Sequence, residues 1–390
     1  MESFNRKFNS FYKIKGKHLD CKYFGICGAC KVYDGGYKAQ LDAKVAINQE
    51  RFAPFTQKEI EVFSSADIHY RSRSEFKIWH KDDKSITYAM NHIEKKEPVF
   101  IDECPQVSKA IFILMPKLLQ EIKEHAIEFK LFGTDFLSAS DGSIVVSLLY
   151  HRKLDEAWSE KANKIAHNLN ISIIGRSRGQ KVVIGQDYVI ENLNINNEIY
   201  RFKYIENSFT QPNKDVNEQM IMWSLRDLKE TSSDMLELYC GAGNFTIPFA
   251  KKFRKVLATE ISKSSIQAAK DNMSYNDVDN IAFVRMGVEE FVGAVDKMRV
   301  FRRMKDINID DYNIKTIFVD PPRSGMDTTS CNFTARYENI IYISCNPETL
   351  ARDLEILTQT HAIEEIALFD QFPYTYHAEM GIKLTRKGKI

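Results

Sequence analysis

Residues 235–245, MLELYCGAGNF, contain the pattern that decides the fold. An apolar run of strand length leads directly into a Gly-x-Gly turn, after which helical spacing begins. Glycines at such a turn let the backbone bend sharply and approach a ligand closely. This stretch therefore predicts a buried strand, a ligand-binding turn and a helix, the first unit of an α/β sheet.

Similar apolar runs recur after residue 214, and stretches with helical spacing separate most of them. The runs are KVLATE, IAFVRM, TIFVDPP, NIIYISC, EEIALFD and GIKLTR. Alternation of this kind predicts a parallel, doubly wound sheet with helices on both faces. Ligands of such sheets bind beyond the carboxyl ends of the strands, so we expect functional residues there.

The residues before 206 follow a different pattern. Alternating segments such as SEFKIWH, SIVVSLLYH, ISIIGRS and KVVIGQDYVI predict strands, and helical spacing interrupts them. This mixture is typical of an α+β domain. We therefore expect three segments: a basic arm with a cysteine motif (1–35), an α+β central domain (36–205) and the α/β domain (206–390).

Composition excludes several classes of protein. The chain has 390 residues, of which 44% are hydrophobic and 27% charged, as in ordinary globular proteins. No apolar run approaches the roughly 18 residues of a membrane span, and the first residues lack the apolar core of a secretory signal. We therefore expect a cytoplasmic protein that binds no membrane. Its seven cysteines are an odd number in a reducing compartment, which favours metal binding or catalysis over disulfides.

The glycine turn and the next strand end suggest a nucleotide-like cofactor. Gly241 and Gly243 form the turn, and Glu260 ends the following strand, where a carboxylate can accept hydrogen bonds from ribose hydroxyls. NAD would fit this pattern in part, but its fingerprint needs a third glycine that GAGNFT lacks. S-adenosylmethionine is therefore the preferred cofactor.

Three later strand ends carry reactive side chains. Asp320 follows the strand TIFV, with two prolines that stiffen the loop. Cys345 ends the strand NIIYIS, where a thiol faces the ligand edge; the alternative is a small buried hydrophobe. Glu379 and His377 precede the last strand, and from spacing alone they are equal candidates for a general base.

Six segments resemble one known family, the RNA uracil-5 methyltransferases. They are ENSFTQPN (206–213), LELYCGAGNF (236–245), ATEIS (258–262), FVDPPRSG (318–325), YISCNPETL (342–350) and FDQFPYTYHAEMG (369–381). The first and last are most similar to the branch that makes ribothymidine in the T loop of tRNA. The resemblance covers about residues 36–390. It implies a Rossmann-like class I methyltransferase domain, dependent on S-adenosylmethionine, with an N-terminal α+β RNA-binding domain.

The resemblance also implies a reaction and residue roles. Cys345 matches the family nucleophile, which adds to carbon 6 of uracil and makes carbon 5 nucleophilic toward the methyl group. Glu379 matches the base that then removes the proton from carbon 5. The positions that match cofactor contacts are Gln211, Tyr239, Gly241, Gly243, Glu260 and Asp320. The implied partner is the T arm of tRNA, with the uridine at position 54 as target, and no obligate protein partner is evident.

The cysteines near the N-terminus depart from the tRNA branch. Cys21, Cys27 and Cys30, with the distant Cys104, resemble the iron–sulfur motif of the ribosomal RNA branch. Three close thiols and a fourth can hold [4Fe–4S], and four thiolates can also hold zinc. Zinc sites more often use two short pairs, so the spacing favours the cluster.

RNA contacts are expected on the segment HYRSRSEFKIWH (69–80). Arg71, Arg73 and Lys77 are candidates for phosphate contacts, with Trp79 and His80 nearby for stacking. The alternative is a half-buried strand whose charged residues face water. Methylation of ribosomal RNA, an RNA-folding chaperone activity and cytosine methylation are rival functions, although a pure RNA binder needs neither Cys345 nor the cofactor turn.

Overall fold

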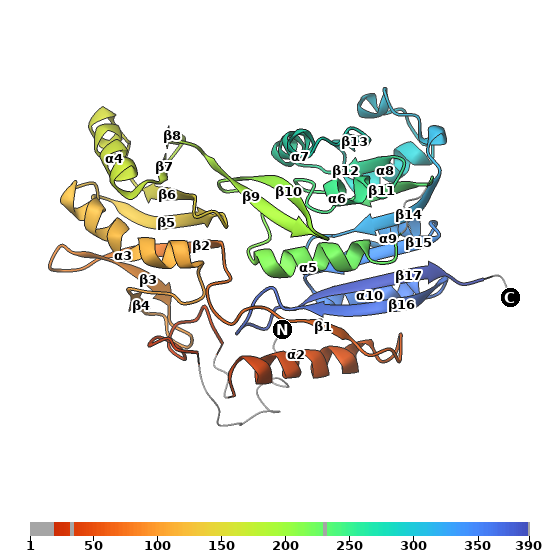
Figure 1. Cartoon of the computed structure of the whole chain (residues 1–390), viewed down its shortest axis with the longest axis horizontal. Coiled ribbons are helices and arrows are strands. Elements are labelled where there is room, and N and C mark those ends of the chain that lie inside the picture. Colours follow the sequence, from red (N-terminus) through yellow and green to blue (C-terminus); the bar gives the residue numbers. More distant parts are fainter. Residues whose placement is uncertain (1–18, 32–34, 229–231, 389–390) are drawn as a thin grey trace.

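The computed structural model describes residues 19–31, 35–228 and 232–388, so the basic arm before residue 19 lies outside the described residues. Two β-sheets stand side by side, and a β-hairpin lies between them (Figure 1). The central sheet belongs to residues 73–184, whereas the second sheet belongs mainly to the C-terminal part of the chain. Within the described residues, no helix has the length and apolar character needed to cross a bilayer.

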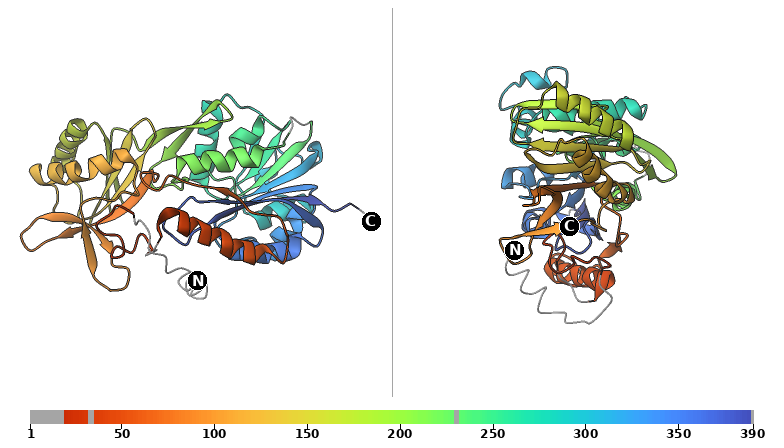
Figure 2. Two further views of the ribbon diagram at one scale, coloured as in Figure 1. Left: turned by 60° about the horizontal axis from the view of Figure 1, so that its bottom comes forward. Right: turned by 90° about the vertical axis from the view of Figure 1, so that its left-hand side faces the viewer.

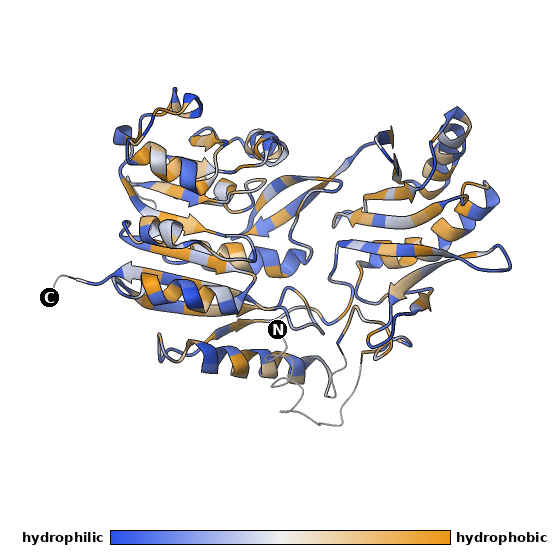
Figure 3. Cartoon of the chain, turned by 180° about the vertical axis from the view of Figure 1, so that it is seen from behind, coloured by the Kyte–Doolittle hydropathy of each residue, from blue (hydrophilic) through white to orange (hydrophobic). Residues whose placement is uncertain are grey.

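The central sheet has the strand order β4-β3-β2-β5-β6-β7-β8. Its strands are β2 (Arg73–His80), β3 (Ile86–Asn91), β4 (Pro98–Ile101), β5 (Leu131–Ser138), β6 (Ile144–Tyr150), β7 (Ser172–Ser177) and β8 (Gln180–Ile184). Helices α3 (Lys109–Glu124) and α4 (Glu156–Leu169) pack on one face. Apolar and polar residues alternate along the strands, as expected for a sheet that buries one face (Figure 3).

The C-terminal sheet has the strand order β1-β16-β17-β15-β14-β11-β12-β13. Its strands are β1 (Glu61–Phe63), β11 (Asp234–Leu238), β12 (Val256–Thr259), β13 (Ile281–Val284), β14 (Ile314–Val319), β15 (Asn339–Ser344), β16 (His361–Phe369) and β17 (Glu379–Arg386). Successive residues of one strand enter two different cores: Met235 packs with one and Leu236 with the other.

Helices cover both faces of this sheet, which confirms the doubly wound α/β fold. One face contacts α5 (Lys214–Leu225), α6 (Thr246–Ala250) and α7 (Lys263–Tyr275). The opposite face contacts α2 (Gly36–Phe52), α8 (Val288–Val295), α9 (Thr328–Thr334) and α10 (Pro347–Leu357). Two short 3-10 turns, η1 (Arg302–Met304) and η2 (Ile309–Asp311), precede β14.

The expectation of a wholly parallel sheet is wrong at one strand. β17 runs antiparallel to both of its neighbours, β15 and β16. The physical reason is the connection: residues 370–378 join β16 to β17 without a helix, and a strand that returns without a crossover must run in the opposite direction. This reversal places the first residue of β17, not its last, at the edge where the parallel strands end.

Two early elements pack with the C-terminal sheet, although they precede the central domain in sequence. β1 pairs in parallel with β16 at the sheet edge, and α2 lies along the same side of the sheet (Figures 1 and 2). Leu41, Phe52 and Ile60 are buried in the same core as α10 and β17. By packing, residues 36–63 therefore lie with the methyltransferase-like sheet rather than with the central sheet.

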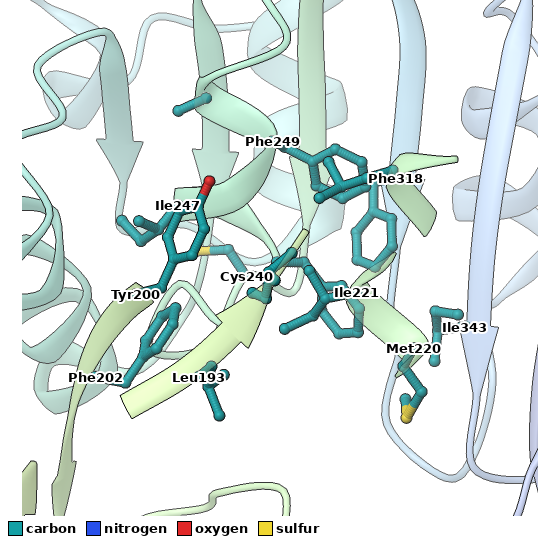
Figure 4. Close-up of a cluster of buried hydrophobic side chains, with 14 of the residues drawn as sticks. Leu193, Tyr200, Phe202, Met220, Ile221, Cys240, Ile247, Phe249, Phe318 and Ile343 are labelled. Atoms are coloured by element: carbon teal, nitrogen blue, oxygen red, sulfur yellow. The ribbon is translucent and has the colours of Figure 1, made fainter. Parts of the chain in front are cut away.

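The hairpin of β9 (Tyr188–Ile195) and β10 (Glu198–Ile205) closes the core beneath the glycine turn. Leu193 and Phe202 from the hairpin, Ile221 from α5 and Phe318 from β14 gather around Cys240 (Figure 4). Cys240 is only 5% exposed, and burial raises the pKa of its thiol well above the ordinary value. This cysteine is therefore part of the core.

Candidate active site

Most of the residues expected in the site meet along one edge of the C-terminal sheet. The parallel strands β12, β11, β14 and β15 end there, and the antiparallel β17 begins there. In the order of the strands, the edge presents Glu260, the turn 239–243, Asp320, Cys345 and Glu379. Residues separated by up to 140 positions in the chain thus form one row.

The glycine turn has the backbone geometry of a ligand cradle. Tyr239, Gly241 and Gly243 have φ values of 62°, 54° and 85°, in the left-handed region that favours glycine. A Cβ atom at Gly241 would meet no atom within 4 Å, so space remains open beside the turn. The Glu260 carboxylate accepts hydrogen bonds from the amides of Gly241 (3.1 Å) and Ser262 (2.7 Å), which ties the turn to the next strand.

Gln211 lies in the segment just before α5, a helix that packs beside the glycine turn. It is 8% exposed and lies two residues before Asn213, the N-cap residue of α5. Asn217 and Asn244 exchange hydrogen bonds of 2.9 and 2.8 Å, which hold α5 against the glycine turn. A buried amide side chain close to an open turn is suited to bind a polar ligand.

Cys345 and Glu379 face each other across neighbouring strands. In the β15–β17 ladder Ser344 lies opposite Met380, so the next antiparallel pair is Cys345 and Glu379. Burial raises the pKa of the Cys345 thiol to about 12, and the Glu379 carboxyl adds to this rise. Burial likewise raises the pKa of Glu379 to about 8, with a further contribution from Asp320.

The carboxyl groups form a connected, buried cluster. Asp320 has a pKa raised to about 7 by burial. Glu237, one strand away, is 1% exposed, and its Oε2 atom has no hydrogen-bond partner in the structure. Burial raises the pKa of Glu237 well above its ordinary value, and Asp320 adds to the effect. A cation bound at this edge would be stabilised by these carboxylates and would favour their ionised forms.

His377, the rival base candidate, is placed differently from Glu379. His377 is exposed, and its ring lies 5.6 Å from that of Phe372, whereas Glu379 is 5% exposed. Partial burial and the nearby Arg323 guanidinium lower the pKa of His377 to about 4. The geometry therefore favours Glu379 as the group paired with Cys345.

A buried ion pair holds the loop that leads to Glu379. Lys44 Nζ lies 2.6 Å from Asp370 Oδ1, and both side chains are 0% exposed. Lys44 also donates to the Phe372 carbonyl (3.0 Å), and Gln40 donates to Asp370 Oδ2 (3.0 Å). The Tyr374 amide donates to Gln40 Oε1 (3.2 Å). Helix α2 thus fixes residues 370–374 from one side.

Sequence reasoning missed Lys44, Gln40 and Asp370. Gln40, Lys44 and Asn48 recur every four residues, a pattern that normally predicts the solvent face of a helix. In the structure this polar stripe is 0–1% exposed, because it faces the loop after β16. No signal in the sequence joins these residues to Asp370, which lies 326 positions after Lys44.

Of the residues expected to contact RNA, Arg71 and Arg73 lie where the two sheets meet, whereas Lys77 lies within the central sheet. The Arg71 guanidinium lies 5.6 Å from the centre of the Phe372 ring, and its Nε atom donates to the Arg73 carbonyl (2.7 Å). Arg73 donates to the Ser208 carbonyl (2.5 Å), next to the segment with Gln211. Lys77 is exposed and donates to Asn91 Oδ1 (2.8 Å).

The four cysteines near the N-terminus line one cavity. Cys21, Cys27, Cys30 and Cys104 line a cavity of about 30 Å³, with apolar neighbours that include Phe76 and Ile101. All four thiols are free, and burial raises the pKa of each. In the described parts of the chain, however, no group of three or more His, Cys, Asp or Glu residues is arranged to hold a metal ion. The expected iron–sulfur site is therefore not shown.

This cysteine segment also touches the loop before Glu379. The Lys31 amide donates to the Tyr374 carbonyl (2.7 Å), and the ring of Phe24 meets the ring of Tyr374 edge-on at 5.6 Å. The amide of Gly28 donates to the Asn91 carbonyl (2.8 Å), which joins the segment to the central sheet. Residues 19–31 thus connect the central sheet to the candidate active site.

The fold, together with the functional residues at the ends of neighbouring strands, is that of a Rossmann-like methyltransferase. A family model described as tRNA (Uracil-5-)-methyltransferase matches residues 36–387. The chain belongs to this family, as its motifs suggested.

Two relatives illustrate the likeness. The tRNA/tmRNA (uracil-C(5))-methyltransferase of Sulfurimonas denitrificans is 68% identical over 369 residues, which cover 95% of this chain and 100% of that protein. The protein of the same name from Aliarcobacter butzleri is 51% identical over 373 residues, 94% of this chain and 99% of that protein.

A solved structure has a similar fold. It is the Pyrococcus abyssi tRNA (uracil-54, C5)-methyltransferase in complex with S-adenosyl-L-homocysteine. The TM-score is 0.66 and the sequence identity 24%, with 90% of this chain and 83% of that chain covered.

The raised pKa of Glu379 makes a prediction for stability. A carboxyl whose pKa is higher in the folded than in the unfolded chain contributes stability below its unfolded value, and this is lost as the pH rises through the folded value. For Glu379 the window runs from its ordinary 4.5 to about 8. Glu379→Gln should therefore gain stability over wild type by up to about 1.4 kcal/mol per pH unit in this window.

Urea unfolding of the cofactor-free protein at pH 5.5 and pH 8, about 2.5 units apart, measures this difference. Glu355→Gln, at an exposed position in the last turn of α10, is the matched control and should show no pH-dependent difference. If both substitutions changed the free energy of unfolding by the same amount at the two pH values, ionisation of Glu379 would not destabilise the folded protein.

The buried ion pair makes a second prediction. Lys44→Met leaves the Asp370 carboxylate buried without its cation, which should destabilise the protein by about 3–5 kcal/mol. The double variant Lys44→Met/Asp370→Asn removes both charges and should recover much of that stability. Methyl transfer should stay low in the double variant while S-adenosylmethionine binding is retained, because the loop to Glu379 loses its anchor.

Equilibrium unfolding, calorimetric cofactor binding and single-turnover methylation measure these three effects. Lys38→Met changes an exposed lysine of the same helix, 85% exposed, and serves as the control. Full methylation by a well-folded double variant would contradict a positioning role for the pair.

Proposed function

We propose that this protein transfers a methyl group from S-adenosylmethionine to carbon 5 of a uridine in tRNA, at position 54 of the T loop. The observation that carries the proposal is the pairing of Cys345 with Glu379 beside an open cofactor turn. The names of the relatives support tRNA and tmRNA as substrates. A role in tRNA modification also supports a cytoplasmic location.

The described residues fit S-adenosylmethionine. The turn at Gly241 leaves space for the ligand, and Glu260 stands at the next strand end, where a ribose would lie. Asp320 is half-buried and Glu237 is buried, and the pKa values of both carboxyls are raised, so a sulfonium cation would stabilise them as anions. Gln211 and Tyr239 complete the proposed contacts. When bound, the cofactor supplies the methyl group.

Cys345 and Glu379 then act in turn, Cys345 as the nucleophile and Glu379 as the base. The thiolate of Cys345 forms a bond to carbon 6, and the electron pair of the C5–C6 double bond moves toward carbon 5 and the O4 carbonyl. Carbon 5 takes the methyl group and keeps one hydrogen. Glu379 removes this proton, the C5–C6 double bond forms again, and the Cys345 thiolate leaves. The proton ends on Glu379, and the bond between Cys345 and carbon 6, which joined the enzyme to the RNA, is broken again.

The raised pKa values indicate that the cofactor should bind before Cys345 reacts. In the free protein the Cys345 thiol is protonated at neutral pH, since burial and the Glu379 carboxyl oppose its ionisation. Arg323 acts in the opposite direction and lowers the pKa of Cys345. A cation bound near Asp320 would further stabilise the thiolate, so cofactor binding would prepare the nucleophile.

Arg71, Arg73 and Lys77 remain proposed RNA contacts. Arg71 and Arg73 lie next to Phe372 and Ser208, at the junction of the sheets and close to the proposed cofactor site. A uridine that reaches Cys345 must leave its stack, and cations at this junction could hold the flanking phosphates.

We also propose that Cys21, Cys27, Cys30 and Cys104 hold a [4Fe–4S] cluster. Their thiols line one apolar cavity. Three of them come from residues 19–31 and the fourth from the loop between β4 and α3. Such a cluster would join residues 19–31 to the central sheet, a structural role.

Glu379→Gln should trap the covalent adduct between enzyme and RNA. Glutamine keeps the size of the side chain, so binding and methyl transfer should proceed, but the proton on carbon 5 is not removed and the thiol cannot leave. A denaturing gel should show a protein–RNA band that contains methyl label from the cofactor. A band with unlabelled RNA only would place Glu379 before methyl transfer, and normal turnover without a band would leave His377 as the base.

Cys345→Ala is the matched control for this experiment. It should form no band and retain less than about 1% of the wild-type methylation, because loss of a covalent step costs several powers of ten. Binding of S-adenosylmethionine should be unchanged, since the thiol makes no proposed contact with the cofactor.

The cysteine site is tested by metal analysis. Anaerobically purified protein should be brown and contain about four irons with sulfide. Cys104→Ser should lose the iron, whereas Cys331→Ser, at a buried cysteine of helix α9, should keep it. Zinc in place of iron would indicate a zinc site, and protein without metal would exclude both.

A further inference from the structure

The proposed cofactor contact Gln211 lies in an irregular segment. Residues 206–213, all of which the structure describes, join β10 to α5 and form neither a helix nor a strand. The segment begins with a tight turn, in which the Ser208 amide donates to the Ile205 carbonyl (3.1 Å) and Asn207 has a φ of 60°. Because such a segment makes no regular ladder of hydrogen bonds, its path depends on the groups that hold it from outside.

The central sheet holds the start of this segment through the carboxylate of Glu206. This residue is 6% exposed, and Arg176 of β7 donates to both of its oxygens, from Nε to Oε1 (2.7 Å) and from Nη2 to Oε2 (2.5 Å). Ser147 of β6 donates from its hydroxyl to Oε1 (2.6 Å). A guanidinium that binds a carboxylate at two points fixes direction as well as distance. The position of Glu206 is therefore set by two strands of the central sheet.

Arg176 is the cation that bonds Glu206 directly. Burial raises the pKa of Glu206, but the hydrogen bonds from Arg176 and Ser147 outweigh burial and hold this pKa below its ordinary value. Lys181 of β8 lies 3.8 Å from Glu206 Oε2, which is too long for a hydrogen bond, and binds Asp187 at 2.6 Å instead. Glu206 is thus ionised at neutral pH, and its hydrogen-bonded cation is Arg176.

The region around the first strand of the same sheet holds the other end of the segment. The Pro212 carbonyl accepts hydrogen bonds from the amide (2.7 Å) and the hydroxyl (3.0 Å) of Ser72, directly before β2. Asn213 forms an isolated antiparallel bridge with Arg71. Gln211 therefore lies between two anchors that are both attached to the central sheet, although it precedes α5 of the methyltransferase-like sheet.

We propose that Arg176 is a positioning residue for cofactor binding: through Glu206 it fixes the segment that presents the Gln211 amide to the cofactor. A contact that is already held in place costs little conformational entropy when the ligand binds, whereas a released segment must first be ordered. The central sheet thus takes part in cofactor binding from outside the cofactor site. This inference rests on Gln211 being a cofactor contact, as proposed above.

A double-mutant cycle on cofactor binding tests the proposal. Calorimetry with S-adenosylhomocysteine and the full chain, without RNA, measures the Kd. Arg176→Met and Gln211→Ala should each raise this Kd by about 3- to 10-fold, as expected for the loss of one neutral hydrogen bond. Arg176→Met/Gln211→Ala should bind no more weakly than Gln211→Ala alone, because Arg176 acts through Gln211.

Two milder variants keep the test valid if Arg176→Met does not fold. Ser147→Ala removes one hydrogen bond from Glu206 and leaves the ion pair in place, so it should raise the Kd by a smaller factor. Arg176→Lys keeps the charge but loses the two-point contact and should bind with an intermediate Kd. Neither substitution should change the Kd further when Gln211→Ala is present.

Arg254→Met is the matched control. Arg254 also binds a buried carboxylate at two points, that of Asp234, which is 0% exposed. Asp234 is the first residue of β11, at the opposite end of this strand from the glycine turn. Arg254→Met should therefore destabilise the protein to urea as Arg176→Met does, while its Kd for S-adenosylhomocysteine stays that of wild type.

The outcomes separate this inference from the proposed function. A wild-type Kd in well-folded Arg176→Met would overturn the inference and leave the proposed function intact, and so would an additive loss in the double variant. In methylation kinetics KM for S-adenosylmethionine should rise while KM for tRNA is unchanged. A rise only in KM for tRNA would make Arg176 an RNA contact and overturn the inference. Wild-type protein that binds no S-adenosylhomocysteine would contradict both proposals.

Discussion

The candidate active site depends on one buried ion pair, between Lys44 and Asp370. Two charges that are 0% exposed must satisfy each other, because an unpaired charge in the interior is strongly unfavourable. Their contact joins helix α2, near the start of the chain, to the loop after β16, near its end. Gln40 and Lys44 also donate hydrogen bonds to this loop, and the loop's Tyr374 amide donates to Gln40; together they determine the path along which the chain enters β17, and so where Glu379 lies.

Around that anchor, strand direction brings the reactive groups together. Parallel strands deliver the glycine turn, Asp320 and Cys345 to one edge, whereas the antiparallel β17 delivers Glu379 at its first residue. Besides burial, the carboxyls and the thiol at this edge raise one another's pKa values, because their ionised forms repel one another. A site with excess negative potential is suited to a cationic cofactor, which connects the geometry to the proposed methyl transfer.

Much of the fold and site could be predicted from the sequence. The apolar runs predicted the strands of the doubly wound sheet, and local motifs placed Cys345, Asp320 and Glu260 at strand ends, where the structure has them. The antiparallel direction of β17 was not predicted, because nine residues without helical spacing separate it from β16 and their path has no local signature. The polar stripe of α2 was missed for a similar reason: its pattern is that of a solvent face, and its partner is 326 positions away.

The sequence by itself determined the class of the fold, the cofactor turn and the family, because each depends on residues that are neighbours in the chain. Backbone turns, strand periodicity and strand-end motifs are local, and local interactions can be inferred from local order. Only the tertiary structure decided that Cys345 faces Glu379, that four distant thiols share a cavity and that Lys44 meets Asp370. These are contacts between remote segments, and they exist only once the two sheets have packed and burial has selected which side chains meet.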